Sequence, residues 1–184
     1  IKSGIGEILK VHAIAGKNYF DGIKMSFIDD IPDTKDMIYF IKKALEIKKY
    51  YIEIDEFDKG PRNIFNYGHS FGHAIESATK YSIPHGVAIT MGMDMANHIA
   101  VMRGLLPEVH KDRMHDVFYN IYKDFKNIDI PIENMINALK KDKKNTSSEL
   151  MLIFPIGEKA EIKKIALKFD DNFKNQCMKF LSNV

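Results

Sequence analysis

Three histidines, each next to a glycine, are the residues of this chain best suited to chemistry. His69, His73 and His85 lie within RNIFNYGHSFGHAIESATKYSIPHG, residues 62–86. His69 and His73 are four residues apart, so on a helix they share one face with Cβ atoms roughly 5–6 Å apart. The third histidine arrives from a separate segment. Such a group indicates a metal site or an acid–base site. Each could instead be a structural histidine, but three clustered among glycines favour function.

A carboxylate often completes a catalytic metal site that histidines begin. Glu7 is the best candidate, because it lies in a predicted short helix, residues 3–12, between glycines and an apolar face. A solvated helix carboxylate is an equally good interpretation of its periodicity. Metal ligands must be neutral imidazoles. His85 opens a predicted helix, where the positive end of the helix dipole disfavours the protonated ring.

Several cations could bind an anionic ligand near these residues. Lys10 follows Glu7 by one turn, Lys48 falls on an apolar helical stripe, and Arg62 directly follows Pro61. A cation on an apolar stripe either reaches out to solvent or meets an anion. Arginine suits bidentate capture of carboxylate or phosphate. Each could also be an ordinary surface cation. The run KKDKKN, residues 140–145, is typical of a solvated turn, although one lysine could face inward.

The elements that must position these residues are mostly helical. Asp33 or Thr34 can cap a long helix, and Ile38, Ile41, Leu45 and Ile52 follow one stripe along it. Further helices are predicted over residues 67–81, 85–103, 106–125, 132–139 and 170–181, with Gly104 as a stop signal. Residues 16–32 are expected to be loop-like, and residues 149–155 and 159–167 to pair as strands. We therefore predict a mainly α fold with a small β-hairpin, in one domain over residues 1–184.

Composition excludes several classes of protein. The 184 residues are 45% hydrophobic and 28% charged, as in folded globular proteins, and the net charge of +2 is too small to indicate nucleic acid or a membrane surface as a partner. Residues 87–102 contain Asp94 and His98, which favours a packed helix over a membrane span. One cysteine, Cys177, fits a reducing compartment such as the cytoplasm and is expected to be a buried, inert thiol. The start lacks a signal peptide, and its first residue, Ile1, indicates a piece of a longer protein.

The motifs RNIFNYGHSFGHAIE and the following HG resemble the signature of 3-dehydroquinate synthase and the wider sugar phosphate cyclase family. SGIGEILK resembles the other metal-ligand segment of that family, and DEFDKGPR and KKDKKN fall where the family has similar stretches. The resemblance runs from residue 3 to about residue 157. It implies the helical C-terminal half of such an enzyme, which holds the metal and much of the substrate site. The NAD-binding α/β half is absent, since no glycine-rich turn follows a strand.

The resemblance also implies roles for single residues. Glu7, His69 and His85 match ligands of zinc or cobalt, and His73 matches a histidine that assists phosphate elimination. Lys10 and Arg62 match further catalytic positions. The implied substrate contacts are Lys48, Arg62, Asn66, His73 and one lysine of Lys143 and Lys144, of which we favour Lys143. Asp55 and Asp58 fall near acidic positions of the family, and Val87 stands where glutamate is usual. The implied assembly is a homodimer.

The implied reaction is that of an NAD- and metal-dependent lyase of the shikimate pathway. It converts 3-deoxy-arabino-heptulosonate 7-phosphate to 3-dehydroquinate with release of phosphate, for aromatic amino acid biosynthesis. Lys48 and Arg62 suit a substrate carboxylate, whereas a neutral sugar phosphate would leave that pair poorly matched. The alternatives are another cyclase resembling 2-deoxy-scyllo-inosose synthase, a metal-dependent polyol dehydrogenase, and a non-catalytic helical interaction domain.

Overall fold

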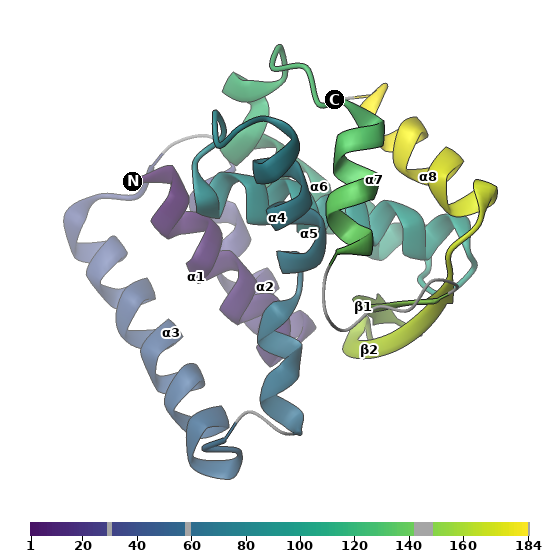
Figure 1. Ribbon diagram of the computed structural model, residues 1–184. Coiled ribbons are helices and arrows are strands. Elements are labelled where there is room, and N and C mark those ends of the chain that lie inside the picture. Colours follow the sequence, from purple (N-terminus) through teal and green to yellow (C-terminus); the bar gives the residue numbers. More distant parts are fainter. Residues whose placement is uncertain (29–30, 58–59, 142–148, 184) are drawn as a thin grey trace.

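The computed structural model describes residues 1–28, 31–57, 60–141 and 149–183. The described structure is mostly helical, with one two-stranded antiparallel sheet at an edge of the molecule (Figure 1). The helices are α1 (Lys2–Ala15), α2 (Lys17–Lys24), α3 (Thr34–Ile54), α4 (His69–Ala78), α5 (His85–Met102), α6 (Glu108–Tyr122), α7 (Ile132–Lys140) and α8 (Asp171–Leu181). Three 3-10 turns, η1 (Met25–Phe27), η2 (Pro61–Asn66) and η3 (Lys123–Phe125), and the strands β1 (Glu149–Ile156) and β2 (Glu161–Lys168) complete it. The predicted mainly α fold with a β-hairpin is confirmed.

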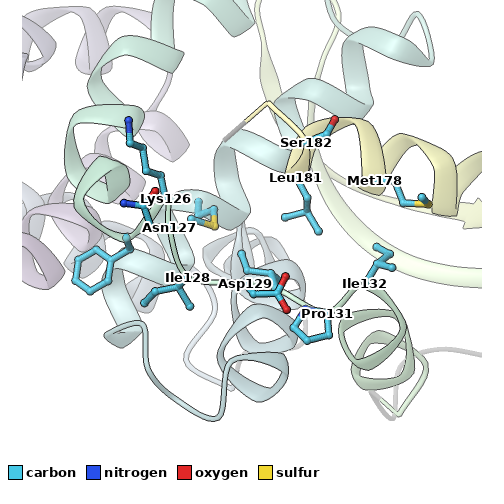
Figure 2. Close-up of a pocket in the computed structure, with 12 residues that line it drawn as sticks. Lys126, Asn127, Ile128, Asp129, Pro131, Ile132, Met178, Leu181 and Ser182 are labelled. Carbon is cyan, nitrogen blue, oxygen red and sulfur yellow. The ribbon is translucent and has the colours of Figure 1, made fainter.

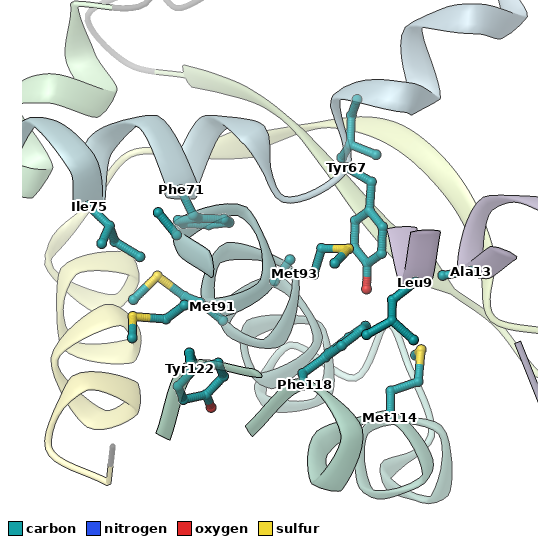
Figure 3. Packing of buried hydrophobic residues seen from close by; sticks show 14 of the residues in the cluster. Leu9, Ala13, Tyr67, Phe71, Ile75, Met91, Met93, Met114, Phe118 and Tyr122 are labelled. Atoms are coloured by element: carbon teal, nitrogen blue, oxygen red, sulfur yellow. The ribbon is translucent and has the colours of Figure 1, made fainter. Parts of the chain in front are cut away.

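Helix α5 forms the centre of the core, with 14 of its 18 residues buried. It packs against α1, α4, α6, α8 and β1. Figure 3 shows Met91 and Met93 of α5 among Phe71 of α4 and Phe118 of α6, all of them buried. Each such side chain removed from water contributes about 1.5–3 kcal/mol. The helix that carries His85 is therefore held on several sides.

The buried carboxylate inside this largely apolar helix is paired. Asp94 is 1% exposed, and its Oδ2 accepts hydrogen bonds from the hydroxyl of Tyr122 at 2.5 Å and from Nδ1 of His115 at 2.7 Å. A packed helix over residues 87–102 is thus confirmed. In the part of the chain that the structure describes, we find no helix with both the length and the apolar character that crossing a bilayer requires.

The predicted helix boundaries hold where a cap fixes them. Oδ1 of Asp33 accepts from the amide of Asp36 at 2.8 Å, so Asp33 is the N-cap of α3. Gly104 follows α5 with a φ of 66°, the left-handed conformation that commonly ends helices. The predicted helix over residues 67–81 is shorter in the structure, because Gly68 has a φ of 78° directly before α4.

Cys177 is buried, and burial raises the pKa of its thiol to about 12, as expected for an inert thiol.

The expectation of a loop over residues 16–32 is wrong. The chain turns at Gly16, whose φ is 119°, and then forms α2 and η1. Phe20, Ile23 and Phe27 follow each other at helical spacing and are buried. Burial of these three side chains, rather than local propensity, accounts for the ordered turns, because short helices are stabilised mainly by tertiary packing.

The stripe of apolar residues noted along α3 is not the buried face of that helix. Ile38, Ile41, Leu45 and Ile52 are 43–59% exposed, whereas the neighbouring face buries Phe40 and Ala44. A helix of 21 residues with apolar side chains on two sides can turn only one of them to α1. In Figure 1, α3 lies along the edge of the molecule opposite to α8 and the sheet.

The two strands pair in register from Glu149 opposite Lys168 to Ile156 opposite Glu161. Leu150, Leu152 and Phe154 of β1 are buried, at the alternating positions that face the helices. The predicted hairpin is confirmed, and β1 packs against α5.

Candidate metal centre

The helices that carry the candidate residues touch one another at glycines. A Cβ atom added to Gly86 of α5 would lie 2.0 Å from the carbonyl oxygen of Ser3 in α1. A Cβ added to Gly92 would lie 2.3 Å from the carbonyl oxygen of Gly68 and 2.7 Å from the amide nitrogen of Gly72, at the start of α4. Only glycine allows backbones this close. Glu7, His69, His73 and His85 each lie beside such a glycine, and for this reason they converge.

The three histidines form one cluster. One ring nitrogen from each of His69, His73 and His85 lies within 4.8 Å of the others. Their ring centroids are 5.3 Å (His69–His73), 5.7 Å (His69–His85) and 5.6 Å (His73–His85) apart. His69 is half-buried and the other two are exposed, so the cluster opens to solvent. Imidazole nitrogens at this spacing suit a divalent transition metal ion.

Two of the three rings are held through Nδ1. The Nδ1–H of His69 donates to the carbonyl oxygen of Tyr67 at 3.3 Å, and that of His85 donates to both carboxylate oxygens of Glu76 at 3.2 Å. Both rings therefore keep the lone pair of Nε2 free. Within the described residues, His73 has no acceptor of this kind. Anchoring of Nδ1 is typical of metal-ligating histidines.

The electrostatics keep His69 neutral. Burial lowers the pKa of His69 to about 4, and the positive charge of Lys10 acts in the same direction. The ring is consequently unprotonated at neutral pH, as a metal ligand must be.

Glu7 interacts electrostatically with His69, but among the described residues the group of ligand atoms within 4.8 Å of one another is made of the three histidines and does not include it. Its carboxylate binds two lysines. Its Oε1 is 2.9 Å from the ammonium of Lys10, and its Oε2 is 3.6 Å from that of Lys48. Burial opposes the charged form of Glu7, but Lys10 and Lys48 outweigh it and lower the pKa of the carboxyl. Burial in turn lowers the pKa of Lys10, which is 3% exposed. Lys48 thus meets an anion, one of the two outcomes expected for a cation on an apolar stripe.

A cavity of about 270 Å³ includes one of the three histidines, His69, in its wall. It is lined by Lys10, Lys48, Ile52, Arg62, Phe65, Asn66 and His69. Four of the predicted site residues other than the metal ligands therefore meet in one cavity with His69. The positive charges on its walls favour an anionic ligand.

A second cavity, of about 460 Å³, shares Asn66 and His69 with the first and is also lined by His73 and Lys141. Sequence reasoning did not single out Lys141, although it lies in the lysine run of residues 140–145. Lys143 and Lys144 lie outside the described residues, as does Asp58.

The loop before η2 is shaped by Asp55. Its Oδ2 accepts from the amides of Gly60 at 2.9 Å and of Arg62 at 3.0 Å. The Nη1 of Arg62 donates to the carbonyl oxygen of Glu56 at 3.1 Å. Asp55 therefore positions the segment that carries Arg62, a supporting role that the sequence did not reveal.

The candidate metal site does not lie in the cavity with the greater volume. A larger cavity, of about 640 Å³, lies between residues 125–132 and the end of α8 (Figure 2). Among the described residues, the charged side chains of its lining are Lys126 and Asp129, and none of the lining residues is a histidine. Three convergent imidazoles mark the smaller cavities as the candidate site.

The chain is similar to known proteins in sequence and in fold. A family model described as 3-dehydroquinate synthase C-terminal matches residues 4–145. A bifunctional 3-dehydroquinate synthase/phosphatase of Fusobacterium nucleatum subsp. nucleatum is 30% identical over 187 residues, which cover 97% of this chain and 28% of that protein. The chain spans 43–51% of the length of other curated 3-dehydroquinate synthases.

Two solved structures share the fold. The structure of 2-deoxy-scyllo-inosose synthase complexed with carbaglucose-6-phosphate, NAD+ and Co2+ matches with a TM-score of 0.79 and 22% identity, over 97% of this chain and 52% of that chain. The 2-epi-5-epi-valiolone synthase from Streptomyces hygroscopicus subsp. jinggangensis, with NAD+ and Zn2+ bound, matches with a TM-score of 0.75 and 19% identity, over 99% and 51%. The resemblance seen in the sequence motifs is confirmed, and this chain belongs to the 3-dehydroquinate synthase C-terminal family.

Proposed function

We propose that this chain is the metal- and substrate-binding half of a 3-dehydroquinate synthase. The enzyme would be a carbon–oxygen lyase that converts 3-deoxy-arabino-heptulosonate 7-phosphate to 3-dehydroquinate and phosphate in the shikimate pathway. The observation that carries the proposal is the position of three imidazole nitrogens within 4.8 Å of one another, next to a cavity lined by Lys10, Lys48 and Arg62. Metal ligands beside a cationic cavity suit a phosphorylated sugar acid.

Glu7, His69 and His85 are the residues we propose to hold a zinc or cobalt ion. The two histidines have Nδ1 anchored and Nε2 free, and the lysines keep Glu7 ionised. A site of two histidines and one carboxylate leaves a position for substrate. The ion, when bound, would supply Lewis-acid polarisation of a substrate oxygen. His73, without an anchored Nδ1 in the described structure, remains free to move a proton.

The remaining residues would bind and orient the substrate. Lys48 and Arg62 suit its carboxylate, and Asn66 can bond a hydroxyl through its side-chain amide. Lys10, 3% exposed, holds a positive charge beside Glu7, where little water screens it. His73 would give a proton to the departing phosphate, with Lys143, or else Lys144, as a further anion contact.

NAD would come from the half of the enzyme that the chain does not span. NAD+ is bound in the two solved structures compared above, and the chain covers 51–52% of those chains. We also propose a cytoplasmic homodimer, in which this single domain, residues 1–184, contributes the metal and substrate residues.

Metal content of the purified chain tests the site. We expect about one divalent ion per chain after exposure to zinc, lost in Glu7→Ala and in His85→Ala but retained in His73→Ala and in the control His98→Ala. Loss in His73→Ala with retention in Glu7→Ala would instead make the three histidines the ligand set. Absence of metal in the unaltered chain would refute the proposal and favour a non-catalytic helical domain.

Phosphate release tests the reaction. In the enzyme with both halves, NAD-dependent release is expected from 3-deoxy-arabino-heptulosonate 7-phosphate and not from glucose 6-phosphate. Lys48→Ala and Arg62→Ala should lower this release, because both cations would face the carboxylate. Release from glucose 6-phosphate would favour the cyclase alternative. Oxidation of a polyol without phosphate release would favour the dehydrogenase.

A further inference from the structure

We propose that Glu76 is a positioning residue of the metal centre, whose carboxylate sets the tautomer and the ring orientation of His85. The inference rests on the proposed function, because His85 matters here as a metal ligand. Glu76 is absent from the residues that motif and charge reasoning singled out.

The geometry places the carboxylate behind the ring. Glu76 lies on α4 and is 8% exposed, and both of its oxygens are 3.2 Å from Nδ1 of His85 at the start of α5. The side chain of His85 is 50% exposed, so solvent alone would leave it mobile. The ring is instead tied to a buried group of a neighbouring helix, on the side away from its free nitrogen.

The two parts of Glu76 have separate partners. Its backbone carbonyl accepts from the amide of Tyr81 at 2.7 Å and from the hydroxyl of Thr79 at 3.3 Å. Its carboxylate oxygens both face His85. The helix end is therefore closed by the backbone, and a change confined to the carboxylate acts on His85.

An ionised carboxylate can only accept hydrogen bonds. The proton of neutral His85 must then lie on Nδ1, and the lone pair on Nε2, which is left for the ion. Without this acceptor an exposed imidazole would exchange between both tautomers and rotate. Histidine ligands are commonly held by such a carboxylate, whose loss lowers metal affinity about 10–100-fold.

The sequence spacing supports a shared role. His69, His73 and Glu76 stand at positions i, i+4 and i+7, which fall on one face of α4. One helix thus presents two members of the cluster and the residue that holds the third.

Metal affinity of variants tests the inference. Zinc titration in competition with a chelator, at neutral pH, should give a dissociation constant about 10–100-fold higher for Glu76→Met. Glu76→Gln keeps an accepting oxygen but loses the charge, so its dissociation constant should lie between those of the unaltered chain and of Glu76→Met. Asp94→Asn is the matched control: Asp94 is also a buried carboxylate bonded to a histidine, His115 at 2.7 Å, but it lies outside the cluster. We expect the control to retain the affinity of the unaltered chain.

The second readout needs no metal. Nitrogen-15 NMR of the metal-free chain should give His85 as the Nδ1–H tautomer, with a mixture of tautomers in Glu76→Met. An unchanged tautomer, or a zinc affinity within about twofold of the unaltered chain, would overturn the inference. Failure of the proposed function is a different result, because it appears as absence of zinc binding in the unaltered chain, before any variant is compared.

Discussion

The contact between α4 and α5 predicts opposite effects for two glycine-to-alanine substitutions. Gly92 lies inside α5, where an added Cβ would meet the backbone of the α4 segment. Gly22 lies inside α2, where an added Cβ would meet no atom of the described residues within 4 Å. Both substitutions improve helix propensity, by up to about 1 kcal/mol. They differ in what the new methyl group contacts.

The structure gives the size of the penalty at Gly92. The methyl group would lie 2.3 Å from the carbonyl oxygen of Gly68 and 2.7 Å from the amide nitrogen of Gly72, whereas non-bonded heavy atoms rest about 3.5 Å apart. The start of α4 must therefore retreat by about 1 Å. Overpacking costs about 1–3 kcal/mol, and the upper half of that range applies because backbone atoms must move. After the gain in propensity, Gly92→Ala should be less stable by about 1–2 kcal/mol.

Urea denaturation followed by circular dichroism measures both variants. Gly22→Ala should be more stable than the unaltered chain by about 0.5–1 kcal/mol, so the two variants should differ by roughly 2 kcal/mol. Gly92→Ala should also bind zinc more weakly, since the retreat moves His69 and His73 relative to His85. Equal stability of the two variants would refute the close helix contact described here.

Three further changes test other contacts. The hydrogen bond from His115 to Asp94 raises the pKa of His115 in the folded state. The resulting stabilisation is therefore present below about pH 6.5 and is lost as the pH rises through the folded-state pKa. The loss of unfolding free energy caused by His115→Gln should accordingly be larger at about pH 6 than at about pH 9. Tyr67→Phe removes the hydroxyl donor that lies 2.5 Å from Oδ1 of buried Asn97 and should lower the unfolding free energy by about 1–3 kcal/mol. We expect a lower melting temperature, and an unchanged melting temperature would contradict this hydrogen bond. Asp55→Ala should speed hydrogen exchange at the two loop amides that its carboxylate binds, whereas equal exchange rates would show that other groups hold the loop.

Local sequence patterns predicted where most helices and strands lie, but they did not predict which side of each element is buried. The helix that begins at Thr34 was recognisable because Asp33 caps it. The β-hairpin was recognisable because a short apolar run, residues 149–155, is followed by a segment of alternating pattern, residues 159–167. Which side of α3 is buried could not be predicted, because apolar residues occupy two sides of it and the position of α1 decides between them. The α2 helix was missed because eight residues are too short for a reliable period, and Gly22 weakens its propensity further.

The candidate site divides in the same way. The shared face of His69 and His73 follows from their spacing along one helix, and the pairing of Glu7 with Lys10 from a spacing of three. The approach of His85 depends on glycine contacts between helices. Glu76 contacts His85 across two different helices, so no local sequence pattern predicts that contact. The place of Glu76 in the i, i+4, i+7 series with His69 and His73 did put it on the same helix face as those histidines.

The exposed side of α3 has a consequence for the behaviour of the chain in solution. Ile38, Ile41 and Leu45, 43–59% exposed, lie at helical spacing and form an apolar strip along a single helix. Water is a poor solvent for such a strip, and the attraction between two of them rises with protein concentration and with salts such as sulfate. Dilute solutions low in sulfate will therefore contain separate molecules, whereas concentrated or sulfate-rich solutions will favour self-association through this helix.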